Sequence, residues 1–162
     1  MPYDARWPAR FEAERSALET ALGDRLVGGV HHVGSTAVPG LDAKPIVDIL
    51  AGVDALATTR HCVEMLERVG WCYAPYRTRE MHWFCKPDPS RRTHHLHLVP
   101  VGSPRFRAEL AFRDHLRANP GDAAEYATLK RRLAARHGAD REAYTEGKTE
   151  FIRAILQRAS DT

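Results

Sequence analysis

The sequence lacks the features that mark several large classes of protein. Its three cysteines, Cys62, Cys72 and Cys85, form no CxxC pair, so neither a disulfide framework nor a zinc ribbon is expected. No window approaches the ~18 apolar residues of a membrane span. The first ten residues contain no apolar leader, so we expect a cytoplasmic protein with no membrane partner. No GxxxxGK[ST] string occurs, which argues against a P-loop kinase.

Lysine is also scarce. Only four of the 24 Lys and Arg residues are lysines, namely Lys44, Lys86, Lys130 and Lys148. The net charge is +3, and the cations are spread along the chain rather than gathered in a basic arm. Together with the absence of an aromatic-interleaved basic strand or a recognition helix, this favours a small anionic partner over a nucleic acid. Because arginine is the usual surface cation here, the positions of the lysines are informative.

The 162 residues suffice for one domain with its own core, and we expect a single domain over 1–162. Apolar spacing and end signals predict helices at 5–22, 54–69, 104–118, 122–137 and 140–159, and strands at 25–33, 45–51, 71–76, 81–86 and 93–100. This order indicates an α/β (α+β) fold, in which helices pack on one mixed sheet and the last three form a C-terminal helical cluster.

The stretch "HHVGSTAVPGLDAKPIVDIL" at 31–50 is the first candidate for chemistry. Gly34 permits a tight turn with exposed N–H groups, and the hydroxyls of Ser35 and Thr36 could hold a phosphate, with Lys44 nearby as a point charge. Asp48 is a carboxylate in a strand whose other residues are expected to be buried. A buried, ionised carboxylate requires a cation or metal as its partner. The alternative is an ordinary turn followed by an aspartate that accepts a hydrogen bond at a strand end.

The strand "THHLHLVP" at 93–100 is the second candidate. Strand alternation places His95 and His97 on one face, where they could bind a metal, contact a phosphate or transfer protons. Satisfied structural histidines are the alternative. His31 and His32 precede the glycine turn, and His32 is expected to be the one that reaches the site.

Each of the last three helices places one cation on its apolar face. Arg113 follows the stripe of the first, while Lys130 and Lys148 lie on the stripes of the next two, each in a Tyr-x-x-x-Lys repeat, "YATLK" and "YTEGK". Snorkelling or a salt bridge to Glu14 or Asp114 could account for single cases. The presence of three cations on inward faces predicts that together they bind an anion such as a polyphosphate.

These motifs resemble the GrpB family of the nucleotidyltransferase-fold superfamily over nearly the whole chain. The resemblance depends on "HHVGSTAVPGLDAKPIVDI" at 31–49, "THHLHLV" at 93–99, "FRDHLR" at 112–117, "YATLK" at 126–130, "YTEGKTEF" at 144–151, and the spaced Trp7, Phe11 and Glu14. Family members also occur fused to dephospho-coenzyme A kinase. The resemblance implies a nucleotidyltransferase-like mixed β-sheet with extra helices closing over it.

In that superfamily a Gly-Ser turn binds nucleotide phosphates, and carboxylates on the next strand and a later one hold two divalent metals. By position, Gly34 and Ser35 match the turn and Asp48 matches an acidic-strand position. Ile46 and Leu50 reduce the usual acid-x-acid pair to one residue, and His95 or His97 takes the place of the later acid. The implied metal is Mg²⁺ or Mn²⁺, with Asp48 and His97 as ligands.

Three functional hypotheses follow. In the first, the protein is a transferase that moves a nucleotidyl or phosphoryl group to a small molecule. Asp48, His95 and His97 are then catalytic, while Gly34, Ser35, Thr36, Lys44, Arg113, Lys130 and Lys148 bind the phosphates. In the second, a catalytically reduced module binds a nucleotide or coenzyme A-like ligand and acts with a protein partner. In the third, the polar residues form structural networks.

Overall fold

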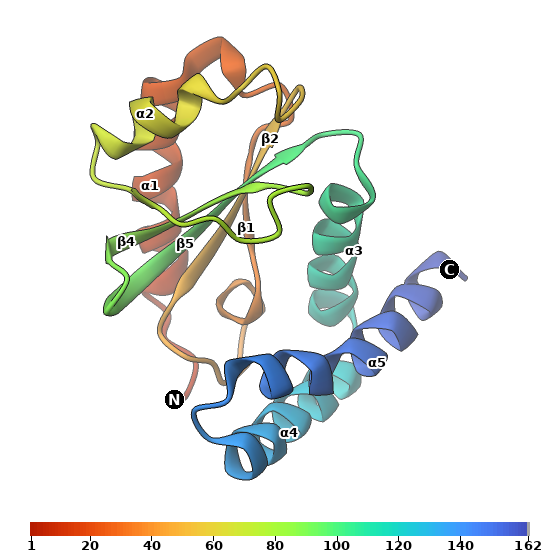
Figure 1. The fold of residues 1–162 in the computed structure, drawn as a ribbon. Helices are drawn as coiled ribbons and strands as arrows, with labels where there is room; N and C mark the ends of the chain where they lie inside the picture. Colours follow the sequence, from red (N-terminus) through yellow and green to blue (C-terminus); the bar gives the residue numbers. More distant parts are fainter. Residues whose placement is uncertain (162) are drawn as a thin grey trace.

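The computed structural model of the protein describes residues 1–161. Within them the elements are α1 (Trp7–Leu22), η1 (Gly23–Arg25), β1 (Val30–Val33), η2 (Ser35–Ala37), β2 (Val47–Val53), α2 (His61–Glu67), β3 (Cys72–Tyr73), β4 (His82–Asp88), β5 (Arg91–Pro100), α3 (Pro104–Ala118), α4 (Pro120–His137) and α5 (Arg141–Ser160), where η marks a short 3-10 helix (Figure 1). The predicted order of helices and strands is confirmed.

One five-stranded sheet joins the strands in the order β1-β2-β5-β4-β3. The neighbouring strands β2 and β5 are parallel, and every other neighbouring pair is antiparallel. The predicted mixed sheet is therefore confirmed. This pairing places Asp48 opposite Val33 on one side and opposite His95 on the other, so it brings together residues that are 47 positions apart.

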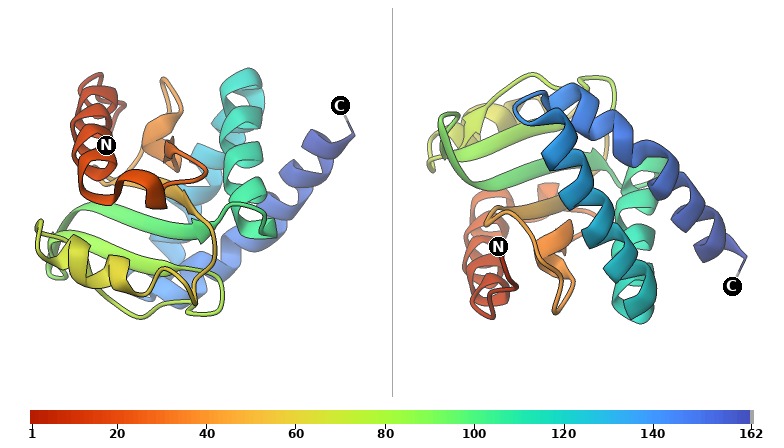
Figure 2. Two further views of the ribbon diagram at one scale, coloured as in Figure 1. Left: turned by 90° about the horizontal axis from the view of Figure 1, so that it is seen from above. Right: turned by 90° about the horizontal axis from the view of Figure 1, so that it is seen from below.

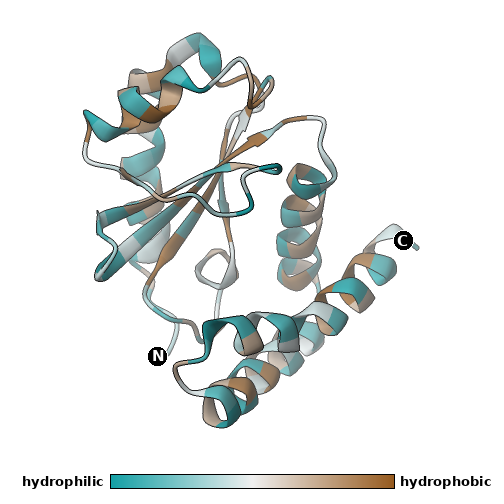
Figure 3. Ribbon diagram, viewed as in Figure 1, coloured by the Kyte–Doolittle hydropathy of each residue, from teal (hydrophilic) through white to brown (hydrophobic). Residues whose placement is uncertain are grey.

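The two faces of the sheet carry different helices, because strand side chains alternate between faces. One face packs against α1 and α2 in the main core, which includes Trp7, Phe11, Ile49, Leu66 and Leu96. The opposite face packs against α3 through a cluster that includes Leu50, Cys85 and Phe106. Figure 2 shows the sheet between these helices, and Figure 3 shows hydrophobic residues concentrated along its central strands.

A third apolar cluster, the C-terminal cluster, attaches the last helices to the loop that follows η2. It consists of Val38, Leu41, Leu116, Ala123, Tyr126 and Ala127, with Phe112 and Phe151 packed against it. Helices α4 and α5 therefore lie across the end of the sheet where β1 finishes and β2 begins (Figure 1). No helix in residues 1–161 is both long and apolar enough to cross a membrane.

Three predicted elements are shorter than expected. The strand predicted at 71–76 is reduced to Cys72–Tyr73. The strand predicted from residue 25 begins at Val30. Before it, Gly28 and Gly52 touch so closely that a Cβ on Gly52 would lie 2.7 Å from the Gly28 Cα. The helix predicted from residue 54 begins at His61. The residues before it form turns, in which the Thr59 hydroxyl donates to the Ala55 carbonyl (2.6 Å).

Candidate anion-binding site

The glycine turn lies directly against the Asp48 carboxylate. Gly34 has φ 74° and ψ −174°, a conformation that is essentially restricted to glycine. A Cβ at this position would collide with the Asp48 carboxylate oxygen and approach its Cβ to 3.1 Å. Glycine is thus required both for the backbone angle and for the space, and the next residue, Ser35, is held beside Asp48.

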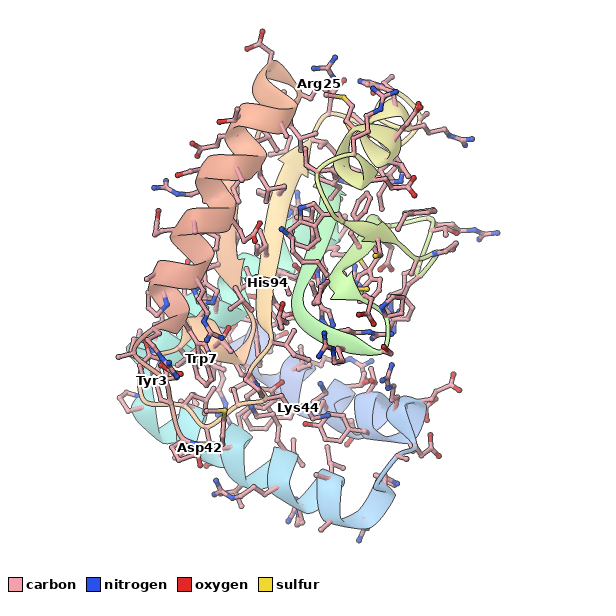
Figure 4. The ribbon with its side chains drawn as sticks, turned by 90° about the vertical axis from the view of Figure 1, so that its left-hand side faces the viewer. Tyr3, Trp7, Arg25, Asp42, Lys44 and His94 are labelled. Atoms are coloured by element: carbon pink, nitrogen blue, oxygen red, sulfur yellow. The ribbon has the colours of Figure 1, made fainter. Side chains whose placement is uncertain are left out.

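Two of the four lysines reach this turn from helices far along the chain. Lys130, on α4, donates from Nζ to Ser35 Oγ (2.7 Å) and to the Asp42 carbonyl (3.0 Å). Lys148, on α5, lies near enough to Asp48 for the two charges to affect each other's pKa. Asp42 and Lys44 lie at the end of the sheet next to these helices, whereas Trp7 and His94 lie on the side that α1 covers (Figure 4).

The Tyr-x-x-x-Lys repeats place each lysine over the tyrosine one helical turn before it. Lys130 Nζ lies 5.0 Å from the Tyr126 ring centroid, and Lys148 Nζ lies 4.7 Å from that of Tyr144. Lys44 Nζ also lies 5.0 Å from the Tyr144 centroid, so one ring contacts two ammonium groups. We call Lys44, Lys130 and Lys148 the lysine cluster.

The charges of Asp42 and Asp48 only partly offset the positive charge of the lysine cluster in the described residues. Within residues 1–161 its members form no ion pair with a carboxylate, whereas Lys86 binds Glu14 at 2.9 Å. Burial and the charge of Lys148 lower the pKa of Lys130 to about 8. Burial likewise lowers the pKa of Lys148, and Lys44 adds to this effect. Lys44 is exposed, and the other two are half-buried.

Asp48 and His95 form a hydrogen-bonded pair in the centre of the site. His95 Nδ1 and Asp48 Oδ1 are 3.0 Å apart, and their side chains are 20% and 28% exposed. Burial alone would raise the pKa of Asp48, but the His95 hydrogen bond and the charges of His97 and Lys148 lower it below its usual value. Since an ionised carboxylate only accepts, Nδ1 must donate. The other ring nitrogen of His95, Nε2, is buried and has no hydrogen-bond partner within the described residues.

His97 points from the same face of β5 but binds a different carboxylate. Its Nδ1 lies 2.9 Å from Glu109 Oε1 on α3, and Arg105 donates to the same oxygen at 2.9 Å. Burial would lower the pKa of His97, but the charge and hydrogen bond of Glu109 raise it above its usual value. Burial opposes ionisation of Glu109, whose pKa is nevertheless lowered by His97 and Arg105.

Three residues expected at the site make their contacts elsewhere. Thr36 Oγ1 lies 2.9 Å from Nε2 of His32, and the His32 ring stacks on Phe11 of α1, so the structure places both on the other side of the turn. The expectation that His32 reaches the site is therefore corrected, because alternation along β1 turns it toward α1. Arg113 donates to the His32 carbonyl (3.2 Å) and pairs with Asp114 (2.8 Å).

Sequence patterns did not identify Glu109 or the part played by Asp42. Glu109 binds His97 only because α3 packs on that face of the sheet, and periodicity does not show which strand a helix covers. Asp42 contributes its main-chain carbonyl to Lys130, a role that any residue could perform. The contacts of Tyr126 and Tyr144 can be predicted from the sequence, since the repeat places each tyrosine on the same helical face as its lysine.

The donor groups around Asp48 do not fit a resident Mg²⁺ or Mn²⁺ ion. These ions prefer several oxygen ligands, yet one Asp48 oxygen is bonded to His95 and the other abuts Gly34. His97, the second expected ligand, uses Nδ1 for Glu109. Across residues 1–161, no three His, Cys, Asp or Glu side chains are grouped so that they could hold a metal. The contacts of Asp48 and His97 thus argue against a resident metal held by these two side chains, and the binding of Mg²⁺ or Mn²⁺ stays a prediction.

Fold and site together define a mixed-sheet protein with a cationic site between the glycine turn and the C-terminal helices. A family model described as GrpB protein matches residues 1–158, and the chain belongs to the GrpB family. A UPF0157 protein of Pseudomonas aeruginosa is 47% identical over 98% of this chain. The crystal structure of the conserved protein GrpB from Enterococcus faecalis has a TM-score of 0.86 at 35% identity, covering 98% of this chain and 95% of that one.

The chain corresponds to only part of some relatives. It spans 66% of the length of the Pseudomonas protein. A dephospho-CoA kinase of Mycolicibacterium paratuberculosis is 31% identical over 99% of this chain, but the chain spans 46% of that protein. The predicted similarity to dephospho-CoA kinases is thus confirmed for a part of that protein's length.

Proposed function

We propose that the protein binds a phosphorylated small molecule, either a nucleotide or a coenzyme A-like compound, with its phosphate groups between Ser35 and the lysine cluster. The observation that carries this proposal is the cluster itself. Three of the four lysines meet at one place and form no ion pair with a carboxylate in the described chain. Gathering like charges is unfavourable. The carboxylates of Asp42 and Asp48 offset this cost only in part, because the pKa values of Lys130 and Lys148 stay lowered, so a bound anion would stabilise the cluster.

The lowered pKa values of Lys130 and Lys148 support the same proposal. They express the cost of keeping two ammonium groups close together and partly out of water. A phosphate group would remove much of this cost, since it offers several oxygen acceptors and a negative charge to the same donors. Ser35 Oγ is already held at one of these donors, and its hydroxyl can turn toward the ligand.

The binding experiment uses calorimetry and thermal unfolding with tripolyphosphate, ATP and coenzyme A, each with and without Mg²⁺. At one hundred times its dissociation constant, a bound probe should stabilise the protein by about 2.7 kcal/mol. Lys148→Met should weaken binding, whereas Arg153→Met, which removes an exposed cation from the same helix, should not. If none of the three probes stabilises the wild-type protein, the proposal is refuted.

A second candidate function, group transfer, is favoured by the unpartnered Nε2 of His95. With Nδ1–H donated to Asp48, Nε2 carries a lone pair that a substrate hydroxyl could satisfy. The hydroxyl oxygen would attack a phosphorus atom, the bond to the leaving phosphate would break, and the proton would pass to Nε2. A divalent cation would arrive on the phosphate oxygens as part of the substrate, because the site does not provide the ligands to hold one.

This second candidate is tested separately from binding. Phosphorus NMR would follow ATP with Mg²⁺ or Mn²⁺ in the presence of the protein, with water or a supplied polyol as acceptor. His95→Gln should abolish turnover and leave tripolyphosphate affinity nearly unchanged, because the lysine cluster remains. Turnover that survives in His95→Gln would exclude His95 as the base, and binding without any turnover would favour the binding module.

A further inference from the structure

A separate cavity lies behind the glycine turn, on the side that faces α1. Its volume is about 310 Å³, at the lower end of the range found for small-molecule sites. Four parts of the chain line it: the N-terminal segment with α1, strand β1, the turn through Thr36 and Ala37, and α3. Gly34, Ser35, Asp48 and the lysine cluster are not among its lining residues, so this cavity is distinct from the anion-binding site.

One guanidinium group in this cavity lacks an anionic partner. Arg117 donates from Nε to the Ala37 carbonyl (2.8 Å) and forms no ion pair with a carboxylate in the described part of the chain. The other two arginines of the cavity are paired: Arg113 with Asp114 at 2.8 Å, and Arg15 with Glu12 at 2.6 Å. Within residues 1–161, Arg117 is therefore the one arginine of the cavity without a carboxylate at ion-pair distance, although the charge of Asp114 favours its charged form.

The electrostatic effect of Arg117 is visible at its neighbours. Burial lowers the pKa of His32 to about 4, and the charges of Arg117 and Arg113 contribute to this shift. His32 is thus neutral near pH 7 and adds no second cation. Burial and the repulsion from Arg113 also lower the pKa of Arg117 itself. An anion beside Arg117 would offset the part of both shifts that comes from the positive charges.

Apolar and aromatic side chains form the smaller part of the cavity wall and lie together on the side of α1. Phe11 stacks on His32 with ring centroids 4.9 Å apart and planes 13° from parallel, and Tyr3 and Pro8 continue this wall. The hydroxyl of Thr36 is already bonded to His32, and Arg15 and Arg113 are paired with carboxylates. This leaves the exposed guanidinium of Arg117 as the charged group available to an anion.

We propose that this cavity binds a small monocarboxylic acid with an apolar or aromatic body. Its carboxylate pairs with the guanidinium of Arg117, and its body packs along Phe11 and Pro8. One unpaired cation matches one negative charge, and the planar fork of arginine suits the two oxygens of a carboxylate. A phosphate dianion would bring more charge than the cavity neutralises. The proposal does not depend on the function proposed for the lysine cluster.

The test is a titration with benzoate, followed by calorimetry and by NMR shifts of the Thr36 and Ala37 amides. Inorganic phosphate is titrated in parallel. Arg117→Gln should weaken benzoate binding about tenfold or more, since it removes a charged hydrogen-bond donor. Arg107→Gln, on the same helix with its guanidinium bonded to the Gly102 carbonyl, should bind as the wild type does.

A further variant gives an effect in the opposite direction. Glu12→Gln removes a carboxylate from the cavity and frees Arg15, so it should strengthen benzoate binding several-fold. This gain would not arise from damage to the fold. The proposal is overturned if benzoate causes no shifts at the turn amides, if Arg117→Gln binds benzoate as the wild type does, or if phosphate binds there and benzoate does not.

Discussion

Replacing Lys130 by methionine tests the anion-binding site most directly. The substitution removes one ammonium group and keeps an unbranched side chain of similar length. In the wild type, Nζ donates to Ser35 Oγ at 2.7 Å, so it can also reach a phosphate held at that serine. A hydrogen bond between charged groups contributes about 1.5–3 kcal/mol. We therefore expect tripolyphosphate to bind Lys130→Met about 10- to 150-fold more weakly.

The pH dependence gives a second, independent readout. The pKa of Lys130 is lowered to about 8 in the free protein. A bound anion stabilises the ammonium form and raises this pKa, so binding takes up a proton at pH values between the free and the bound pKa. Affinity should accordingly be greatest below pH 8 and fall as the pH rises above it. Lys130→Met should lack this step.

The assay is titration calorimetry at several pH values, in paired buffers that differ in ionisation enthalpy. At pH 8 the wild type should show uptake of about half a proton or less from this group, and the variant should not. Arg132→Met, which removes an exposed cation two residues further along α4, is the matched control. Equal affinities for wild type and Lys130→Met, or identical proton uptake, would show that Lys130 does not contact the ligand.

Three further predictions concern the turn and the two carboxylates. Gly34→Ala should reduce the free energy of unfolding, measured by denaturant titration, by about 2–4 kcal/mol, because it adds a clash with Asp48 to an unfavourable backbone angle. The control is Gly40→Ala, where φ is 80° but the space around the Cβ is open, and it should cost only about 1 kcal/mol. Asp48→Asn should strengthen metal-free tripolyphosphate binding about 3- to 10-fold, the effect of ~1 kcal/mol of removed repulsion, and weaker binding in calorimetry would contradict this. Glu109→Gln should cost about 1–3 kcal/mol at pH 6. The raised pKa of His97 means that the charged pair contributes fully below 6.5, the ordinary pKa of histidine, while Glu109 is ionised. The contribution is lost as the pH rises through the raised pKa, so urea unfolding should show a smaller difference in alkaline buffer, and a constant difference would disprove the charged pair.

The order of the elements and the faces of the helices could be predicted from the sequence because both depend on local periodicity. The helix repeats gave the inward positions of Lys130 and Lys148, which the structure places at the turn and near Asp48. Strand alternation gave the shared face of His95 and His97. These features need only the geometry of one helix or strand.

Pairings between distant segments could not be predicted in this way. That β2 lies parallel to β5, with Asp48 opposite His95, depends on the order of strands in the sheet. The binding of His97 to Glu109 depends on where α3 packs. Thr36 and Arg113 were assigned to the phosphates because of their nearness in sequence or their helical face, but a turn presents its side chains in several directions. Only the packed structure decides which of them point toward α1.

The turn that carries Ser35 is fastened by side chains from two helices that come much later in the chain. Arg117 of α3 holds the Ala37 carbonyl, and Lys130 of α4 holds Ser35 Oγ. Helices α4 and α5 are joined to the rest through the C-terminal cluster, apart from the two cores on the faces of the sheet. A local opening of these two helices would therefore withdraw Lys130 and Lys148 while the sheet stayed folded. Ligand binding would then be coupled to the closure of the last helices. Hydrogen exchange in α4 and α5 would slow when the site is occupied, although the glycine turn belongs to a distant part of the chain.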